Sequence, residues 1–232
     1  MAATATADVT ERTPVFIPPF TTRLRRALGA ARTLAKDPGR LDQVLVFLLA
    51  VNIKAIARRV KDLESLTEGR EILAARPRID RTHVDFEALE TLPEGTLGRE
   101  YVRFLKTNGI TPDVFAELPD VGDPRAAYMV LRMRQTHDLW HVLTGYTPDV
   151  PGEILLQAFT HSQTGAPGSL MIALFGTLRY VMWKKGPVVA FRDLAKAFRH
   201  GKSCAFLPTV YWEREWSTPV SELRERLHCP AA

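Results

Sequence analysis

Apolar residues recur at helical spacing along most of the chain, and no stretch alternates apolar and polar residues between hairpin turns. The segment 96–109 is typical, because its apolar positions follow a helical period and a glycine ends it. The segment 123–146 opens with Asp-Pro and continues to Gly145, and the segment 151–165 opens with a proline and stops at a glycine. We expect a helix over each of the three.

The same criteria predict further helices at 21–40, 40–66, 169–184, 187–201 and 220–228. The chain is therefore expected to be all-α, with a single-domain multi-helix bundle over residues 21–232. Residues 1–20, which are rich in Ala, Thr and Pro, are expected to form a flexible N-terminal arm.

Two apolar stretches, 44–51 and 170–183, raise the question of membrane insertion. A spanning helix needs about 20 apolar residues. Both stretches are too short, so we expect buried helices or the walls of an apolar pocket. The segment 21–40 carries several basic residues, and it is predicted to be either an exposed helix or a helix that rests on anionic lipid.

The composition, with 46% hydrophobic and 25% charged residues, is typical of a folded protein and argues against a disordered chain. The net charge of +5 suits a membrane face, a nucleic acid or an acidic substrate without choosing among them. The N-terminus lacks the basic start and apolar run of a secretory signal. Cys204 and Cys229 lie outside any CxxC pattern, and we expect two free thiols in a reducing compartment.

Two of the six histidines stand four residues apart in the stretch RMRQTHDLWHVLTGYTPDVPGEILLQAF. On a helical wheel His141 falls about 40° from His137, so both imidazoles can reach one ion. Asp138 and Arg134 fall at about 100° and 60° on the same wheel. Glu153 opens the next helix after a short turn, which is expected to return it toward the two histidines. The sequence thus predicts a metal site between two adjacent helices.

Two imidazoles with one or two carboxylates suit zinc, with Fe(II) or Mn(II) as alternatives. Each residue also has an ordinary structural explanation. A histidine pair at this spacing occurs by chance, Glu153 stabilises a helix N-terminus, and Asp138 suits an ion pair with Arg134. The spacing alone leaves both interpretations open.

The motif from His137 to His141, HDLWH, is followed after eleven residues by Glu153. It resembles the signature HDxxH-x11-E of the ubiquinone (coenzyme Q) biosynthesis protein family. The likeness runs from about residue 95 to the end of the chain. Its further motifs are RxR at 132–134, GE at 152–153, QTG at 163–165, YWEREW at 211–216 and ELRERL at 222–227.

The resemblance implies an all-helical fold with Zn²⁺ held by His137, Asp138, His141 and Glu153. It also implies metal-dependent decarboxylation at ring carbon 1 of a polyprenyl 4-hydroxybenzoate intermediate, in some systems oxidative, with a hydroxyl group left in place of the carboxyl group. The alternative is a non-catalytic, zinc-stabilised organiser of a membrane-associated ubiquinone biosynthetic complex that binds prenyl lipids.

The same resemblance implies peripheral contact with a membrane and with other ubiquinone biosynthesis proteins, and a homo-oligomer is open. The expected location is the inner face of the bacterial cytoplasmic membrane, or the matrix side of the mitochondrial inner membrane in a eukaryote. The stretches 44–51 and 170–183 are candidates to line a groove for the prenyl tail. No nucleic-acid motif accompanies the basic charge, so no nucleic-acid partner is expected.

Individual roles follow from the chemistry. Asp138 is expected to be either a fourth ligand or the acid that delivers a proton to the ring. Arg134 is expected either to anchor the substrate carboxylate or to pair with Asp138 or Glu153. His161 is expected to lie on the helix surface or behind the ligands.

Two other enzyme classes fit the sequence less well. An HD-type phosphohydrolase would recruit a further histidine and aspartate, for which His83 and Asp193 are the candidates, but their order and context are poor. A zinc protease of the HExxH type uses a glutamate as general base at the position where this chain has Asp138.

Overall fold

The computed structural model describes residues 14–37, 40–115, 121–183 and 189–232. This part of the chain is helical, with one isolated bridge between Thr96 and Pro219 and no strand, which confirms the all-α prediction. The N-terminal arm expected over residues 1–20 lies largely outside the described residues. The α-helices are α1 Phe20–Lys36, α2 Leu41–Ser65, α3 Thr67–Ala75, α4 Phe86–Glu90, α5 Leu97–Asn108, α6 Pro124–Gln135, α7 His137–Thr144, α8 Val150–Thr164, α9 Pro167–Trp183, α10 Phe191–Ser203 and α11 Val220–Arg226. The connections contain the short 3₁₀ helices η1 Pro112–Phe115, η2 Leu207–Thr209 and η3 Trp212–Arg214.

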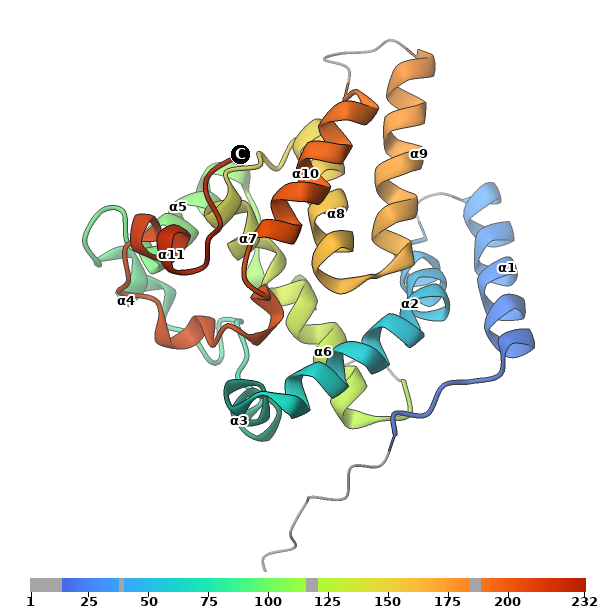
Figure 1. The fold of residues 1–232 in the computed structure, drawn as a ribbon, viewed down its shortest axis with the longest axis horizontal. Coiled ribbons are helices and arrows are strands. Elements are labelled where there is room, and N and C mark those ends of the chain that lie inside the picture. The colour runs from blue at the N-terminus through green and yellow to red at the C-terminus, as the bar shows by residue number, and fades with distance from the viewer. Residues whose placement is uncertain (1–13, 38–39, 116–120, 184–188) are drawn as a thin grey trace, which may run out of the picture.

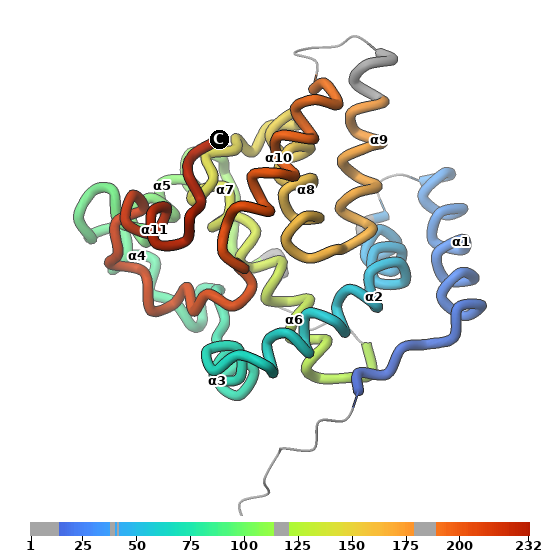
Figure 2. The backbone as a smooth tube through the Cα atoms, in the orientation of Figure 1, coloured from blue at the N-terminus to red at the C-terminus, as the bar shows by residue number. Residues whose placement is uncertain are grey.

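The helices are arranged around α7, α8 and α10 (Figure 1). On one side of them lie α4, α5 and α11, and on the other side lie α2, α9 and α1 (Figure 1). The chain end returns to the middle of the molecule beside α7 and α10, as the backbone trace in Figure 2 shows. The last residue is fastened there, because the Ala232 amide donates to the carbonyl oxygen of Thr144 at the end of α7.

The helix ends around the predicted site follow local rules. α6 begins at Pro124, and the Asp123 side chain accepts hydrogen bonds from amides of the first turn. α8 begins in the same way, with the Asp149 carboxylate accepting from the Gly152 amide at 2.9 Å. Gly165 ends α8 with a φ of +67°, in the left-handed region that glycine adopts without strain.

The single helix expected over 123–146 is wrong, because the structure has two. α6 ends at Gln135 and α7 begins at His137, with Thr136 between them. The Thr136 hydroxyl donates to the Arg132 carbonyl oxygen at 2.9 Å, a side-chain bond that competes with regular helical bonding. The helical-wheel angles calculated for one continuous helix therefore apply to the motif residues of α7 but not to Arg134 of α6.

The core of the molecule is built directly on α7. Leu139, Trp140 and Leu143 are completely buried there, and Phe159 of α8 and Trp212 of η3 belong to the same apolar cluster. Five of the eight residues of α7 are buried, and Leu139, Trp140 and Leu143 are the apolar ones among them. The position of this short helix is therefore set by packing rather than by its own helical propensity.

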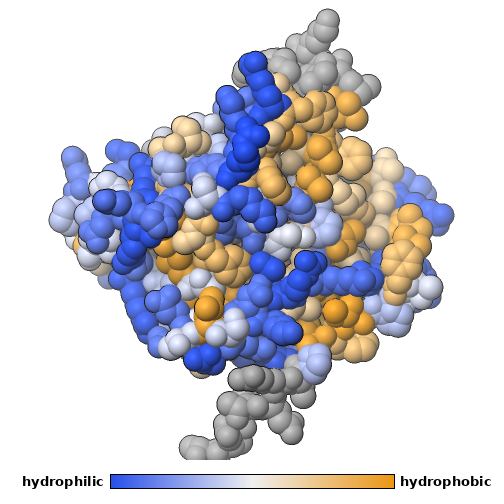
Figure 3. Space-filling model, in the orientation of Figure 1, coloured by the Kyte–Doolittle hydropathy of each residue, from blue (hydrophilic) through white to orange (hydrophobic). Residues whose placement is uncertain are grey.

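The expectation that 170–183 is a buried helix is wrong for its outer face. α9 turns small side chains toward α8, with Ala173 and Thr177 fully buried. Among the side chains of α9 that the structure describes, Leu174, Phe175 and Leu178 lie outside, and Phe175 is 63% exposed. Figure 3 shows apolar residues gathered over the side of the molecule that α9 and α1 form. A helix that is apolar all round does not reveal from its sequence which face is covered.

The sequence motifs RxR and YWEREW meet in a buried ion pair. The Arg132 side chain is 1% exposed and binds both carboxylate oxygens of Glu213, with Nη2 at 2.9 Å from Oε2. Nη2 also donates to the carbonyl oxygen of Val210 at 3.1 Å. The pair joins α6 to η3 and places Trp212 in the core, so these motif residues have a structural role.

The expectation of two free thiols is also wrong. Cys204, which ends α10, forms a disulfide with Cys229, and their Cα atoms are 4.6 Å apart. The segment after α11 folds back on the end of α10, where the Ala205 amide donates to the Leu227 carbonyl oxygen at 2.8 Å. This folding back brings together two cysteines that are 25 positions apart in the sequence. A pair at that separation cannot be predicted from CxxC spacing.

Candidate metal centre

The motif residues lie on two consecutive helices. His137, Asp138 and His141 are on α7, and Glu153 is in the first turn of α8. The Asp149 cap fixes where α8 starts, and the core packing of α7 fixes the histidines. The turn between the two helices, residues 145–149, therefore determines how Glu153 meets the imidazoles.

The ligand atoms of this set lie close together. One side-chain atom from each of His137, Asp138 and His141 lies within 4.8 Å of the other two. Glu153 reaches both histidines with separate oxygens. Its Oε2 is 3.3 Å from Nε2 of His137, and its Oε1 is 3.1 Å from Nε2 of His141.

The protonation of His141 is set by its backbone partner. Nδ1 of His141 is 2.8 Å from the carbonyl oxygen of Tyr146, which only accepts hydrogen bonds, so Nδ1 carries a proton. In the neutral ring, Nε2 then presents a lone pair to the Glu153 carboxylate. Two acceptors at 3.1 Å need a positive partner between them, either a second proton on the ring or a metal cation. A histidine that binds a metal through one ring nitrogen usually donates a hydrogen bond from the other to a backbone carbonyl or a carboxylate, which fixes the orientation of the ring.

The separations suit a small divalent ion. Two nitrogen or oxygen ligands about 2.0–2.2 Å from a tetrahedral zinc lie about 3.4 Å apart. The distances between Glu153 and the two imidazoles, 3.1 and 3.3 Å, are close to that value. The donor set of two imidazoles and two carboxylates, without a thiolate, is one that zinc, Fe(II) and Mn(II) accept. The residues present therefore fit a metal ion.

The two carboxylates of the site are in different electrostatic states. Burial favours the neutral form of Glu153, but its hydrogen bonds with His137 and His141 outweigh burial and lower its pKa to about 2. Burial raises the pKa of Asp138, the nearby Glu153 carboxylate adds to this, and the two imidazoles oppose it. Glu153 is thus an anion suited to a cation, and Asp138 retains a proton more readily.

One side of the site is closed and the other is open. The His141 side chain is fully buried, and the Phe104 ring stacks on it at 5.4 Å. The side chains of His137 and Glu153 are 25% and 40% exposed. A ligand from solvent would therefore approach along His137 and Glu153, on the side away from Phe104.

Other residues considered from the sequence take different places. Arg134 is in the last turn of α6, where burial lowers the pKa of its guanidinium. Nδ1 of His161 bonds the Ala166 carbonyl oxygen at 2.9 Å, which places it outside the ligand cluster. His83 pairs with Asp80, its Nδ1 2.6 Å from the carboxylate.

Asp193, the other residue considered for a phosphohydrolase, lies at the start of α10. Its carboxylate accepts a hydrogen bond from the Ala190 amide at 3.0 Å. The structure therefore assigns His83 and Asp193 ordinary local roles, and neither joins the cluster on α7.

Three contacts around the site could not be read from the sequence. They are the Tyr146 carbonyl, the Phe104 ring and the buried pair that Arg132 forms with Glu213. The carbonyl is a backbone group, so its residue type gives no signal. Phe104 approaches from α5, and Arg132 finds its partner 81 residues away. The RxR and YWEREW motifs contain the two residues of this pair, but their sequence does not show that they meet.

Comparison with known proteins identifies the family of the chain. Residues 19–231 match the family described as "Coenzyme Q (ubiquinone) biosynthesis protein Coq4". The chain belongs to the Coq4 family. The match begins well before residue 95, where the sequence motifs start, and so extends the resemblance to α1 and α2.

Members of the Coq4 family resemble this chain over most of its length. The ubiquinone biosynthesis protein COQ4 homolog of Rattus norvegicus, a mitochondrial protein, is 35% identical over 202 residues, or 87% of this chain and 76% of the rat protein. The mitochondrial homolog of Homo sapiens is 34% identical over 201 residues, with the same coverage of 87% and 76%. A crystal structure of a Nostoc punctiforme protein, named as a ubiquinone biosynthesis protein, gives a TM-score of 0.70 at 30% identity, covering 88% of this chain and 97% of that one.

Proposed function

We propose that this chain acts in ubiquinone biosynthesis and removes the carboxyl group from ring carbon 1 of a polyprenyl 4-hydroxybenzoate intermediate. Membership of the Coq4 family supports the pathway. The observation that supports the chemistry is the 3.1 Å distance between Nε2 of His141 and Oε1 of Glu153, while Nδ1 of His141 already carries a proton. It favours a cation at this place, beside the carboxyl group of Asp138.

The metal would be held by His137, His141 and Glu153, with Asp138 as the fourth ligand or as the proton donor. Zinc is proposed first, with Fe²⁺ and Mn²⁺ as alternatives for the same donors. When bound, the ion supplies a Lewis acid that binds and orients oxygen substituents of the ring.

Asp138 is proposed to supply the proton. The bond between ring carbon 1 and the carboxyl carbon breaks, its electron pair stays on the ring carbon, and the proton of Asp138 goes to that carbon as CO₂ leaves. Burial raises the pKa of Asp138, which favours the protonated form that this step needs. Water then returns a proton to Asp138. In the oxidative alternative, the carboxyl group leaves as CO₂, water supplies the hydroxyl group that replaces it, and dioxygen accepts the two electrons and two protons released and leaves as hydrogen peroxide.

Arg134 is proposed to anchor the substrate carboxylate by a bidentate pair. It precedes His137 by three residues, across the break at Thr136. The anchor idea predicts that Arg134→Lys raises KM and leaves zinc content unchanged, because lysine keeps the charge but not the planar fork. Full turnover with an unchanged KM in that variant would overturn the idea.

The function is tested by turnover of the purified full chain after metal analysis. A short-tailed prenyl 4-hydroxybenzoate is supplied with and without oxygen, and CO₂ and ring product are measured. We expect zinc-dependent CO₂ release by wild type and none by His141→Ala. His161→Ala is the matched control, because that histidine lies outside the cluster and should keep activity.

Each result decides between the two functions. Oxygen-independent CO₂ release with hydrogen at carbon 1 supports simple decarboxylation, and oxygen-dependent release with a hydroxyl group supports the oxidative form. Bound zinc with no turnover under either condition would overturn the enzyme proposal. It would favour the non-catalytic organiser of a biosynthetic complex that binds prenyl lipids.

We also propose that α1 and the outer face of α9 rest on an anionic membrane. None of the helices in the described ranges is long and apolar enough to span a bilayer. Phe20, Leu24 and Leu28 of α1 are 66, 43 and 49% exposed, and Arg25 and Arg26 beside them are exposed too. Large apolar side chains next to arginine are typical of an interfacial helix, and the arginines complement anionic head groups.

This surface would bring the site to a prenylated substrate and to other ubiquinone biosynthesis proteins. It would place the protein on the inner face of a bacterial cytoplasmic membrane, or on the matrix side of the mitochondrial inner membrane. Flotation with vesicles of neutral or anionic lipid tests the contact. We expect binding only to anionic vesicles, weakened at least about tenfold in the double variant Phe20→Ser with Leu24→Ser.

Leu66→Ser is the control, because Leu66 is 46% exposed but lies beyond α2, away from α1 and α9. Equal binding of all three proteins would overturn the membrane assignment. A change from oligomer to monomer in the double variant, without vesicle binding by wild type, would instead assign the surface to a second copy of the chain.

A further inference from the structure

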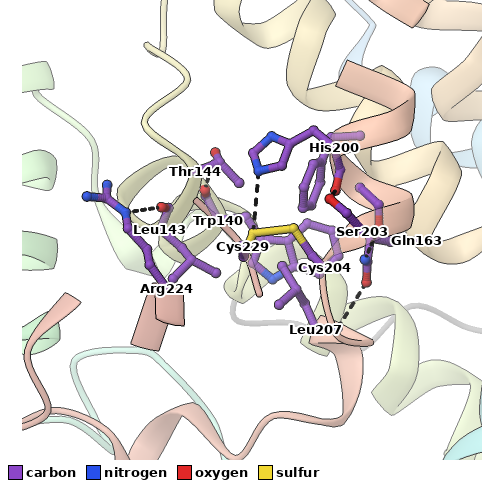
Figure 4. Close-up of a disulfide and its surroundings, with 12 residues drawn as sticks. Trp140, Leu143, Thr144, Gln163, His200, Ser203, Cys204, Leu207, Arg224 and Cys229 are labelled. Atoms are coloured by element: carbon purple, nitrogen blue, oxygen red, sulfur yellow. Dashed lines mark hydrogen bonds between the residues drawn. A yellow bond between two sulfur atoms is a disulfide. The ribbon is translucent and has the colours of Figure 1, made fainter. Parts of the chain in front are cut away.

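A second group of metal-binding side chains lies apart from α7 and α8. His200 and Cys204 are at the end of α10, and Cys229 is in the segment that returns from α11 (Figure 4). One ligand atom from each of the three lies within 4.8 Å of the others. We propose that His200, Cys204 and Cys229 form a second metal site that binds Zn²⁺ when the cysteines are reduced and closes as a disulfide when they are oxidised.

The distance between sulfur and imidazole already suits zinc. Sγ of Cys229 is 3.7 Å from Nε2 of His200. A thiolate about 2.3 Å and an imidazole about 2.0–2.1 Å from a tetrahedral zinc stand about 3.6 Å apart. Two thiolate sulfurs bound to one zinc lie about 3.8 Å apart. After reduction the sulfur atoms of Cys204 and Cys229 therefore need to move apart only to that distance, and His200 does not need to move.

His200 is oriented for this role by a residue of the first site. Its Nδ1 is 3.2 Å from the hydroxyl group of Tyr146, which can accept a hydrogen bond from Nδ1, and the Pro230 backbone also bonds the ring. Tyr146 thus contacts both sites, with its carbonyl oxygen at His141 and its hydroxyl group at His200.

The surroundings favour a neutral cluster. Cys229 is fully buried and Cys204 is 8% exposed, so two bare thiolates would be costly there. Zn²⁺ with two thiolates and a neutral imidazole has no net charge. The two sulfur ligands also distinguish this site from the one on α7, because soft thiolates select zinc over Mg²⁺, Ca²⁺ or Mn²⁺.

Conversion of the disulfide state to the zinc-binding state requires a dithiol reductant, which supplies the electrons. The disulfide accepts two electrons and two protons to give two thiols, and the reductant becomes a disulfide. Zn²⁺ then displaces the two thiol protons as it binds. The reverse needs loss of zinc and an oxidant such as an external disulfide. In this proposal the reduced dithiol state binds the metal, and the disulfide state seen in the structure does not.

The test uses the full chain after chelation, with Co²⁺ or Zn²⁺ as the probe. His141→Ala disables the first site, so metal bound by that variant reports on the second, whatever the outcome of the proposed function. In the reduced variant we expect one equivalent of Co²⁺ with a sulfur-to-cobalt charge-transfer band. We expect loss of that equivalent on oxidation, or when Cys229→Ser is added.

Protection of the thiols provides a second readout that needs no cysteine variant. In reduced wild type, Zn²⁺ should slow alkylation of both cysteines, and His200→Gln should restore the rate. Absence of the charge-transfer band, or equal alkylation with and without zinc in folded reduced protein, would overturn the proposal and leave a disulfide alone.

Discussion

At His141, a single hydrogen bond to the Tyr146 backbone determines what the other ring nitrogen can do. The same turn carries Asp149, whose side chain caps α8 and so positions Glu153. The proposed ligand pair of His141 and Glu153 therefore depends on residues that are not themselves proposed as ligands. Changes in this turn should affect metal binding without touching a coordinating atom.

Gly152 provides a test of that dependence. A Cβ atom at this position would collide with the carbonyl oxygen of Thr147, so Gly152→Ala must shift the start of α8 and with it Glu153. We expect zinc affinity to fall about 10- to 100-fold, measured by competition with a chromophoric chelator. Gly29→Ala is the control, since nothing lies within 4 Å of an added Cβ there. Equal affinities in the two variants would contradict the argument.

Asp138 can be assigned a role by one substitution. An asparagine side chain at this position would keep the size of the aspartate but cannot deliver a carboxyl proton, so Asp138→Asn should retain zinc and lose turnover about 10²- to 10⁴-fold. Metal analysis and the CO₂ assay measure the two effects separately. A parallel loss of zinc and turnover would show instead that Asp138 is a ligand.

At the scale of the elements, α7 is a helix of eight residues, too short to be stable alone. Its core face is packed, and its last carbonyl groups are bonded from the C-terminal segment. Arg224 donates from Nε to the Leu143 oxygen at 2.7 Å and from Nη2 to the Val142 oxygen at 3.2 Å. The helix is thus held at both its side and its end by distant parts of the chain.

The ion pair between α6 and η3 should dominate local stability. Glu213→Gln leaves the buried guanidinium of Arg132 without its charge partner, and the free energy of unfolding should fall by about 3–5 kcal/mol. Denaturant unfolding measures it. Glu90→Gln removes an exposed pair with Lys106 as the control, and about 0–1 kcal/mol is expected there. Similar losses in both variants would contradict the role of burial.

Elements with local signals could be predicted from the sequence. Three such signals are the Asp-Pro start of α6, the proline and glycine at the two ends of α8, and the HDxxH spacing. Each of them affects only residues within one or two helical turns. What depends on distant partners could not be predicted. Tertiary packing decides three features: the pairing of Arg132 with Glu213, the disulfide between Cys204 and Cys229, and the exposed face of α9. The local sequence pattern around these residues does not show which distant partner they meet.

At the scale of the whole molecule, several carboxylates have a lowered pKa and favour the folded state only while ionised. They are the buried or partly buried Asp80, Asp123 and Glu153 and the exposed Asp42 and Asp149. For such groups the stabilisation is present above the unfolded pKa, about 4, and is lost as the pH falls through the lower folded value. The protein should therefore lose stability on acidification below about pH 4.

Asp80 is a suitable probe of this loss. Burial opposes its ionisation, but His83 and Arg78 outweigh burial and lower its pKa. Asp80→Asn should reduce the free energy of unfolding by about 1–3 kcal/mol at neutral pH, and the difference should narrow as the pH drops below about 4. Asp113→Asn, in an exposed pair with Arg81, is the control. A difference for Asp80→Asn that stays constant with pH would contradict the linkage.

The fastening of α7 by Arg224 and Ala232 has a consequence for synthesis of the protein. The ribosome synthesises the histidines of α7 about 80 residues before Arg224 and Ala232, which donate to the last carbonyl oxygens of that helix. A domain completes its packing only after all of its segments have left the ribosome. A nascent chain on the ribosome would therefore display HDLWH without a finished site. We therefore expect the proposed metal to bind after translation, and cells starved of zinc should accumulate full-length chain in which the helices around α7 are packed less tightly.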